Sequence, residues 1–229
     1  MRSLVIVSAG TSQPSTTRML ADSIAAGSIE RLRELDVEAT VGAVEVAPLA
    51  VDVARASVTG VSSTELQAAI EQIAAADAVI ASAPVYKAGI SGLFKSFVDV
   101  LDNDLLIAKP VVLAATAGSS RHALVVDEQM RSLFAYMRAL TLPTSVFAAA
   151  EDWGAAELGE RVRRAATELA VVVQGQIEQG IAGRAWSGYQ HEFAGNATRA
   201  EQTATDLDFD SSLMRLAAGG RTTEKSTSG

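Results

Sequence analysis

Five short runs with strand character alternate with longer stretches of helical periodicity, and no other feature restricts the fold of this chain as strongly. The runs cover residues 4–7, 37–46, 77–83, 111–115 and 144–149. Most of them are continuously apolar, as in strands that are buried on both faces. Such runs, separated by helices of about ten or more residues, predict an α/β fold in which helices cover both faces of a parallel sheet.

The segments between the runs space their apolar residues as helices do. Helices are expected over residues 15–35, 65–75, 93–101, 124–140 and 157–181. Ser15 or Thr16 is expected to cap the first helix. The stretch Ser62-Ser63-Thr64-Glu65 resembles a capping box, with Ser62 as the cap and Glu65 as the reciprocal acceptor. Residues 49–63 show no clear period.

The composition of the chain changes near residue 183. Residues 1–182 contain all five runs and are long enough for one hydrophobic core, so they are predicted to form a single domain. Residues 183–229 are rich in Ser, Thr, Gly and charged side chains, which predicts a polar tail. One short amphipathic helix is expected within the tail, near residues 208–218.

Composition excludes several classes of function. The net charge is −8, from 19 Lys and Arg against 27 Asp and Glu, so a nucleic-acid or anionic-membrane surface is not expected. The chain has no cysteine, which rules out disulfides, thiolate metal sites and cysteine nucleophiles. No metal site is predicted. No apolar run approaches the roughly 18 residues of a membrane span, and the expected location is the cytoplasm.

The first turn of the predicted sheet distinguishes between two strand orders. The dinucleotide-binding order usually carries G-x-G-x-x-G after its first strand, whereas this turn has Gly10 alone among hydroxyl side chains. A Walker loop is absent too. The sequence therefore predicts a flavodoxin-like three-layer sandwich, with five parallel strands in the order 2-1-3-4-5. In that order the loops at 8–17, 84–92 and 116–122 meet at one edge of the sheet.

The first of these loops is rich in hydroxyl groups at the start of a helix. Hydroxyls and main-chain donors at a helix N-terminus can hold a phosphate without a lysine. The candidate ligands are Ser8, Ser15, Thr16 and Thr17. The competing interpretation is an ordinary Ser/Thr-rich turn with a helix cap.

The second loop begins at a proline, which is expected to end the third strand. Pro84, Val85, Tyr86 and Lys87 offer backbone amides, an aromatic wall and a cation to a planar ligand. The competing interpretation is that the Tyr86 ring packs against the protein and the Lys87 ammonium is solvated.

The third loop places small residues, Thr116, Ala117 and Gly118, where backbone can approach a ligand closely. His122 follows, but a hydrolytic triad is not expected because the chain has no G-x-S-x-G elbow. Trp153 comes after the fifth strand, and packing is favoured for it over a place at the site. No side chain is assigned a catalytic role.

These motifs, at their strand ends, resemble the NADPH-dependent FMN reductases of the flavodoxin-like superfamily. The resemblance covers residues 3–180, and its most specific part is the stretch from 81 to 95. It implies FMN phosphate on Ser8, Ser15, Thr16 and Thr17, with the isoalloxazine against residues 84–87 and residues 116–118 along its other edge. It also implies hydride transfer from NADPH or NADH to FMN.

Within that superfamily the chain is most similar to the reductases of two-component monooxygenase systems. This similarity implies a homodimer or homotetramer, formed through the helices after strands 3 and 4, and a possible flavin-dependent monooxygenase partner. One departure concerns the fourth helix, where Glu128 follows Asp127 and flavin-releasing relatives tend to carry tyrosine. Two alternatives therefore stay open: an FMN-retaining reductase of quinones, azo dyes or metal oxyanions, and a non-catalytic flavodoxin-like electron carrier.

Overall fold

The computed structural model describes residues 1–186. The elements in chain order are β1 (Arg2–Ser8), α1 (Thr16–Glu34), β2 (Ala39–Glu45), η1 (Ala47–Leu49), α2 (Ala50–Thr59), α3 (Thr64–Ala75), β3 (Ala78–Tyr86), β4 (Gly89–Ile90), α4 (Gly92–Asp99), β5 (Pro110–Ala117), η2 (Ser120–His122), η3 (Val126–Met130), α5 (Arg131–Tyr136), β6 (Leu140–Thr141), β7 (Val146–Ala149), η4 (Ala150–Asp152), α6 (Ala156–Gln174) and α7 (Ile177–Ala185). Most of the predicted tail, including its helix near 208–218, lies outside the described residues.

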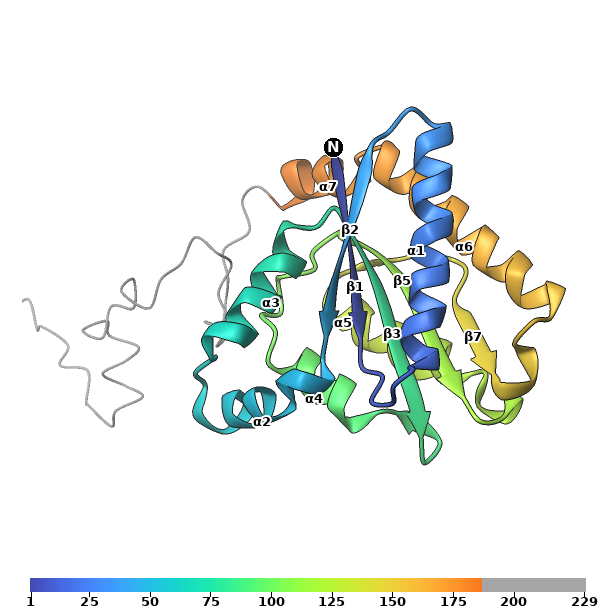
Figure 1. The fold of residues 1–229 in the computed structure, drawn as a ribbon. Helices are drawn as coiled ribbons and strands as arrows, with labels where there is room; N and C mark the ends of the chain where they lie inside the picture. Colours follow the sequence, from blue (N-terminus) through green and yellow to red (C-terminus); the bar gives the residue numbers. More distant parts are fainter. Residues whose placement is uncertain (187–229) are drawn as a thin grey trace, which may run out of the picture. The chain divides into compact units, whose positions relative to one another are not determined.

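The sheet has the predicted flavodoxin-like order (Figure 1). β1 pairs in parallel with β2 on one side and with β3 on the other, and β3 pairs in parallel with β5. Beyond β5, β6 and β7 both pair with that strand, at Pro110–Val111 and at Ala114–Ala117. They are two pieces of one fifth strand, so the order 2-1-3-4-5 is confirmed.

Alternate residues of each central strand enter opposite cores, because side chains along a strand point to opposite faces. In β1, Leu4 and Ile6 pack with residues of α1 and α6, whereas Val5 and Val7 pack with residues of α2, α3, α4 and α5. Figure 1 shows α1 and α6 together on one face of the sheet. Two buried faces explain why these strands are continuously apolar in sequence.

The prediction that Pro84 ends the third strand is wrong. Pro84 lies inside β3 and is aligned with Thr116 of β5, and the strand continues to Tyr86. β1 pairs with β3 only as far as Ser82, so β3 has no β1 neighbour at Pro84. A residue without an N–H is tolerated there because that edge needs no donor.

Two further local predictions were wrong, and a segment for which no element was predicted contains a helix. The unassigned segment 49–63 contains helix α2, which ends at Gly60 with φ +72°. The cap of α3 is Ser63, whose hydroxyl accepts from the Leu66 N–H, and not Ser62. The long final helix is two helices, since Gln176 takes a left-handed conformation with φ +51° between α6 and α7.

The helix predicted over residues 124–140 is broken up as well. Val126–Met130 forms a π-turn, closed by the Arg131 N–H donating to the Val126 carbonyl five residues back. α5 then ends at Tyr136, and Leu140 begins β6. A one-residue expansion of this kind leaves the apolar spacing close to helical, so the sequence pattern does not reveal it.

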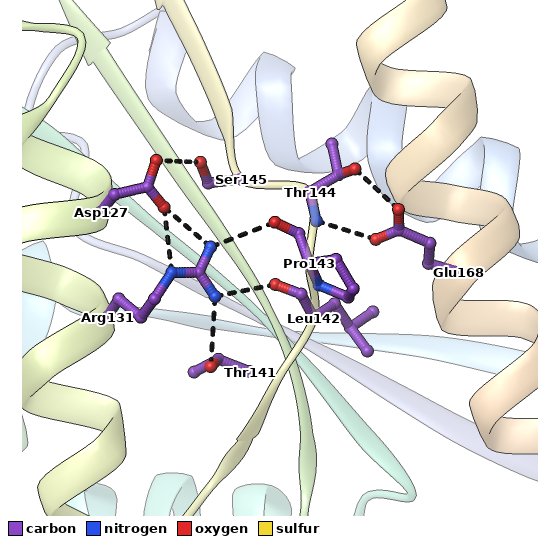
Figure 2. Close-up of polar contacts among 8 residues, drawn as sticks. All are labelled: Asp127, Arg131, Thr141, Leu142, Pro143, Thr144, Ser145 and Glu168. Atoms are coloured by element: carbon purple, nitrogen blue, oxygen red, sulfur yellow. Dashed lines mark hydrogen bonds and ion pairs between the residues drawn. The ribbon is translucent and has the colours of Figure 1, made fainter.

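A polar network fixes the interruption between β6 and β7 (Figure 2). Arg131 donates to the carbonyls of Leu142 and Pro143 at 2.9 and 3.3 Å, and also to Asp127. The Asp127 carboxylate in turn accepts from the Ser145 hydroxyl at 3.0 Å. The strand bends away from β5 here, and these side chains satisfy the carbonyls that leave the ladder.

The opposite, amino edge of the sheet holds a buried lysine. The Lys109 side chain is 3% exposed, and its ammonium lies 3.0 Å from the Glu178 carboxylate of α7 and donates to the carbonyls of Ala74 and Ala76. A buried ammonium requires such partners. The contact fixes α7 beside the starts of β3 and β5.

Within residues 1–186, no helix combines the length and apolarity needed to cross a bilayer.

The cap of α3 provides a test of this fold. Ser63→Ala is expected to lower the free energy of unfolding by about 1 kcal/mol, because it removes the acceptor of the Leu66 N–H. Ser62→Ala is the matched control and should change it by less than about 0.5 kcal/mol. Urea denaturation of both variants measures the difference, and the opposite ranking would restore Ser62 as the cap.

Candidate active site

Three loops at the carboxyl edge of the sheet enclose a cavity of ≈ 350 Å³. They follow β1, β3 and β5, and the segment after β7 closes the far side. The residues that line the cavity are Thr11, Ser12, Thr16, Thr17, Pro84, Val85, Tyr86, Thr116, Ala117, Gly118, Ala150 and Trp153. Its size falls within the range of small-molecule sites, and its position is the topological switch point of the sheet.

Eight of the eleven residues predicted to bind a cofactor line this cavity, and Ser8, Ser15 and Lys87 do not. Ser8 is fully buried at the end of β1. Ser15 accepts a hydrogen bond from the Arg18 N–H as the cap of α1. Lys87 occupies the exposed turn after β3.

A cluster of buried hydroxyl groups joins the first and third loops. Thr17 Oγ1 and Thr116 Oγ1 are 2.7 Å apart, and the Ser82 hydroxyl donates to the Thr17 carbonyl at 2.9 Å. One threonine hydroxyl of the pair donates to the other, so the second keeps a hydrogen for a ligand. The cluster connects α1, β3 and β5 at the floor of the site.

The start of α1 provides donors for an anion. Thr16 and Thr17 are the first residues of this 19-residue helix, and N–H groups in a first turn have no carbonyl partner within the helix. Gly10 allows the first loop to fold tightly over the cap, since a Cβ at this position would lie 1.9 Å from Ser15 Oγ. Only glycine fits that close approach.

The second loop is a hairpin between β3 and β4. Val85 pairs with Ile90 and Tyr86 pairs with Gly89, so Lys87 and Ala88 form a two-residue turn. The Tyr86 hydroxyl lies 3.1 Å from Thr11 Oγ1 and connects this hairpin to the first loop. The ring of Tyr86 is 52% exposed and forms one wall of the cavity.

Residues after β5 and β7 form the remaining wall. Glu151 accepts from the Ser120 N–H at 3.1 Å, which ties the third loop to η4. Hydrogen bonds from the backbone N–H groups of Glu151 itself and of Ser120 lower the pKa of the Glu151 carboxyl. Trp153, for which packing was favoured over a place at the site, both contacts the core beside α6 and lines the cavity.

Sequence reasoning missed Thr11, Ser12, Ala150 and Trp153 as lining residues. Thr11 and Ser12 had the available signal of lying in the hydroxyl-rich loop. The signal for Trp153 was its position after the fifth strand, and Ala150 had none, because its place at the cavity depends on how η4 turns after β7.

The nearby cations are not among the residues that line the cavity. Arg18 pairs with Asp22 at 2.7 Å and with Glu45. Partial burial lowers the pKa of Arg18, but the hydrogen bonds to these two carboxylates outweigh it and raise the pKa above its ordinary value. Neither Arg121 nor His122 is among the lining residues. Within residues 1–186, no group of three or more His, Asp or Glu side chains is placed to hold a metal ion.

The arrangement joins two different surfaces in one site. One end offers hydroxyls and helix N–H groups, which suit a phosphate. The other offers Pro84, Val85 and Tyr86 opposite Ala117 and Gly118, which suits a flat ring.

Residues 1–154 match the family model described as NADPH-dependent FMN reductase. The chain belongs to this family. It is an oxidoreductase that uses FMN with NADPH or NADH.

Curated relatives support the family assignment. An FMN reductase (NADPH) from Pseudomonas aeruginosa is 36% identical over 180 residues, covering 76% of this chain and 94% of that protein. The NADH-dependent FMN reductase SfnE from Pseudomonas putida is 37% identical over 172 residues, covering 71% and 88%. Residues 1–154, which the family model matches, include every residue that lines the cavity.

Solved structures agree with the fold. An oxidoreductase from Corynebacterium diphtheriae is 43% identical, with a TM-score of 0.74 over 76% of this chain and 98% of that one. The NADH:FMN oxidoreductase EMOB in its apo form is 25% identical, with a TM-score of 0.65 over 75% and 89%.

Gly10 provides a test of the site's local geometry. Gly10→Ala is expected to displace the Ser15 cap and lower the free energy of unfolding by about 1–2 kcal/mol. Gly118→Ala is the matched control, because a Cβ there meets nothing within 4 Å, and its unfolding free energy should change by less than about 0.5 kcal/mol. Urea denaturation compares them, and equal stability of the two variants would contradict the close approach.

Proposed function

We propose that the cavity binds FMN with the phosphate at the start of α1 and the isoalloxazine against the β3–β4 hairpin. The supporting observation is the division of the cavity into a hydroxyl-rich end and a flat, largely apolar end. The donors fit a phosphomonoester, and the open space beside the Cα of Gly118 leaves room for a ring edge. The residues present therefore fit the cofactor of the family.

The phosphate end relies on dipoles. Ser12 and Thr16 are exposed at the cavity, Thr17 contributes its main-chain N–H, and the 19-residue helix directs its positive end there. Ser15 supports the phosphate end indirectly, because its hydroxyl caps the helix. The buried Ser8 hydroxyl supports the first loop by accepting from the Gly10 N–H at 3.5 Å. This suits a protein with a net charge of −8, because the attraction for the anion is confined to the site.

The ring end is made by Pro84, Val85 and Tyr86 on one side and by Thr116, Ala117 and Gly118 on the other. Lys87 is exposed on the turn and is not among the lining residues, so its ammonium would act at longer range on a ring that gains charge on reduction. The chemistry that FMN supplies when bound is acceptance of a hydride from the nicotinamide nucleotide. The protein's contribution is to hold the two rings in position, and no side chain serves as an acid or base.

We further propose that FMN is exchanged and not retained, and that a flavin-dependent monooxygenase in the cytoplasm receives it after reduction. Thr11, Ser12, Thr16 and Tyr86 are exposed and leave the site open, and no lysine or arginine is among the described residues that line the cavity. The proposed homodimer or homotetramer would use the helices after β3 and β5, where Leu124 and Tyr136 are exposed apolar side chains.

Exchange of the flavin can be tested with the purified full-length protein. Desalting should remove most of the yellow colour, and FMN-dependent oxidation of NADPH or NADH should return when FMN is added back. Absorbance before and after desalting, followed by a nicotinamide assay, measures both. A flavin that survives desalting would favour the FMN-retaining reductase, and bound FMN without nicotinamide oxidation would favour the electron carrier.

The phosphate assignment can be tested with two flavins that share a ring. Thr16→Ala is expected to weaken FMN binding by about 5- to 20-fold, because it removes a hydrogen bond to a charged group. Riboflavin, which has no phosphate, should bind unchanged. Fluorescence titration measures both affinities, and Ser23→Ala, an exposed serine on the same helix, is the control. Equal weakening of the two flavins would refute this assignment.

A further inference from the structure

The turn that carries the ring wall has an unfavourable sequence for its shape. Lys87 and Ala88 have φ values of +50° and +63°, as the two central residues of a type I′ turn require. Asn-Gly or Gly-Gly usually occupies such a turn, because a Cβ disfavours left-handed backbone. Two consecutive residues with side chains therefore need support from outside the hairpin.

Gln129 of the π-turn provides this support. Its Oε1 accepts from the Ile90 N–H at 3.0 Å, and its Nε2 donates to the Ala88 carbonyl at 3.4 Å. Because Tyr86 and Gly89 are the pair that closes the turn, the N–H of Ile90 faces the outer edge of the hairpin. A Cβ on Gly89 would lie 3.2 Å from Gln129 Oε1, so the amide lies directly against the turn.

The π-turn itself is anchored on a different element. Asp127, two residues before Gln129, accepts from Arg131 and Ser145, and Arg131 holds the carbonyls between β6 and β7 (Figure 2). Residues two apart on a helical segment point in nearly opposite directions. The segment Val126–Met130 therefore has one side fixed to the sheet and the other side on the hairpin.

We infer that Gln129 is a positioning residue for the flavin ring: it holds the Lys87-Ala88 turn closed and thereby sets the place of Tyr86 in the site. The inference rests on the proposed placement of the isoalloxazine against the hairpin. Gln129 is absent from the cavity lining, so it acts through the hairpin backbone. Because Gln129 acts on the ring wall, it should affect the affinity for any flavin, with or without a phosphate.

Gln129→Leu removes both hydrogen bonds at nearly constant volume. In the flavin-free protein, the amide of Ile90 is expected to exchange with deuterium about tenfold faster, because its acceptor is lost. FMN and riboflavin should both bind about 5- to 20-fold more weakly. This common loss differs from the phosphate-specific loss expected of Thr16→Ala.

Two further variants separate positioning from general destabilisation. Gln67→Leu is the matched control, because Gln67 is also half-buried on a helix and bonds only Glu71 at 3.2 Å. It should leave Ile90 exchange and flavin affinity unchanged. Ala88→Gly, added to Gln129→Leu, relieves the positive φ and should restore at least half of the lost affinity, on a logarithmic scale.

Unchanged exchange at Ile90 in Gln129→Leu would overturn the inference, because the hairpin would then be closed without Gln129. Faster exchange with unchanged affinity for both flavins would overturn it too, since the turn would then not set the site. A wild-type protein that binds neither flavin would instead refute the proposed ring placement, and the exchange of Ile90 would still decide whether Gln129 holds the turn.

Discussion

The buried hydrogen bond between Thr17 and Thr116 connects a helix to a strand 99 residues away in sequence. With the Ser82 hydroxyl bonded to the Thr17 carbonyl, it fixes the first turn of α1 against β3 and β5. Buried hydroxyls with partners tolerate little displacement, because an unpaired one costs about 1–3 kcal/mol. The cavity floor is therefore set by three small side chains, and the loops above it can remain open to solvent.

The proposed phosphate end of the cavity has little help from charged side chains of the described residues. Arg18 lies on α1 near its start, but Asp22 and Glu45 already neutralise it. The positive end of the helix and the Ser15 cap remain, and the dipole interaction extends over little more than one turn. A site of this kind would recognise a phosphate by direct contact and would give little long-range attraction to other polyanions.

Much of this organisation could be predicted from the sequence. The continuous runs at 4–7 and 111–115 predicted a sheet covered on both faces, and the strand order predicted that the loops at 8–17, 84–92 and 116–122 meet at one edge, where the cavity lies. The local sequence pattern did not predict the ends of elements that are set by tertiary contacts. Pro84 continues β3 because β1 has already ended beside it, and Ser63 caps α3 although Ser62 fitted the capping-box spacing. The π-turn at Val126–Met130 keeps an almost helical spacing, so neither it nor the contact of Gln129 with the hairpin is visible in the sequence.

The Lys109–Glu178 contact places α7 at the amino edge of the sheet, while the cavity lies at the carboxyl edge. β3 spans the sheet between them with nine residues, a length of about 30 Å. Because the chain has no cysteine, one cysteine introduced on α7 would be its sole thiol. A dye or an electrode linker attached there would report on the enzyme or hold it to a surface with the cavity at the opposite edge of the sheet.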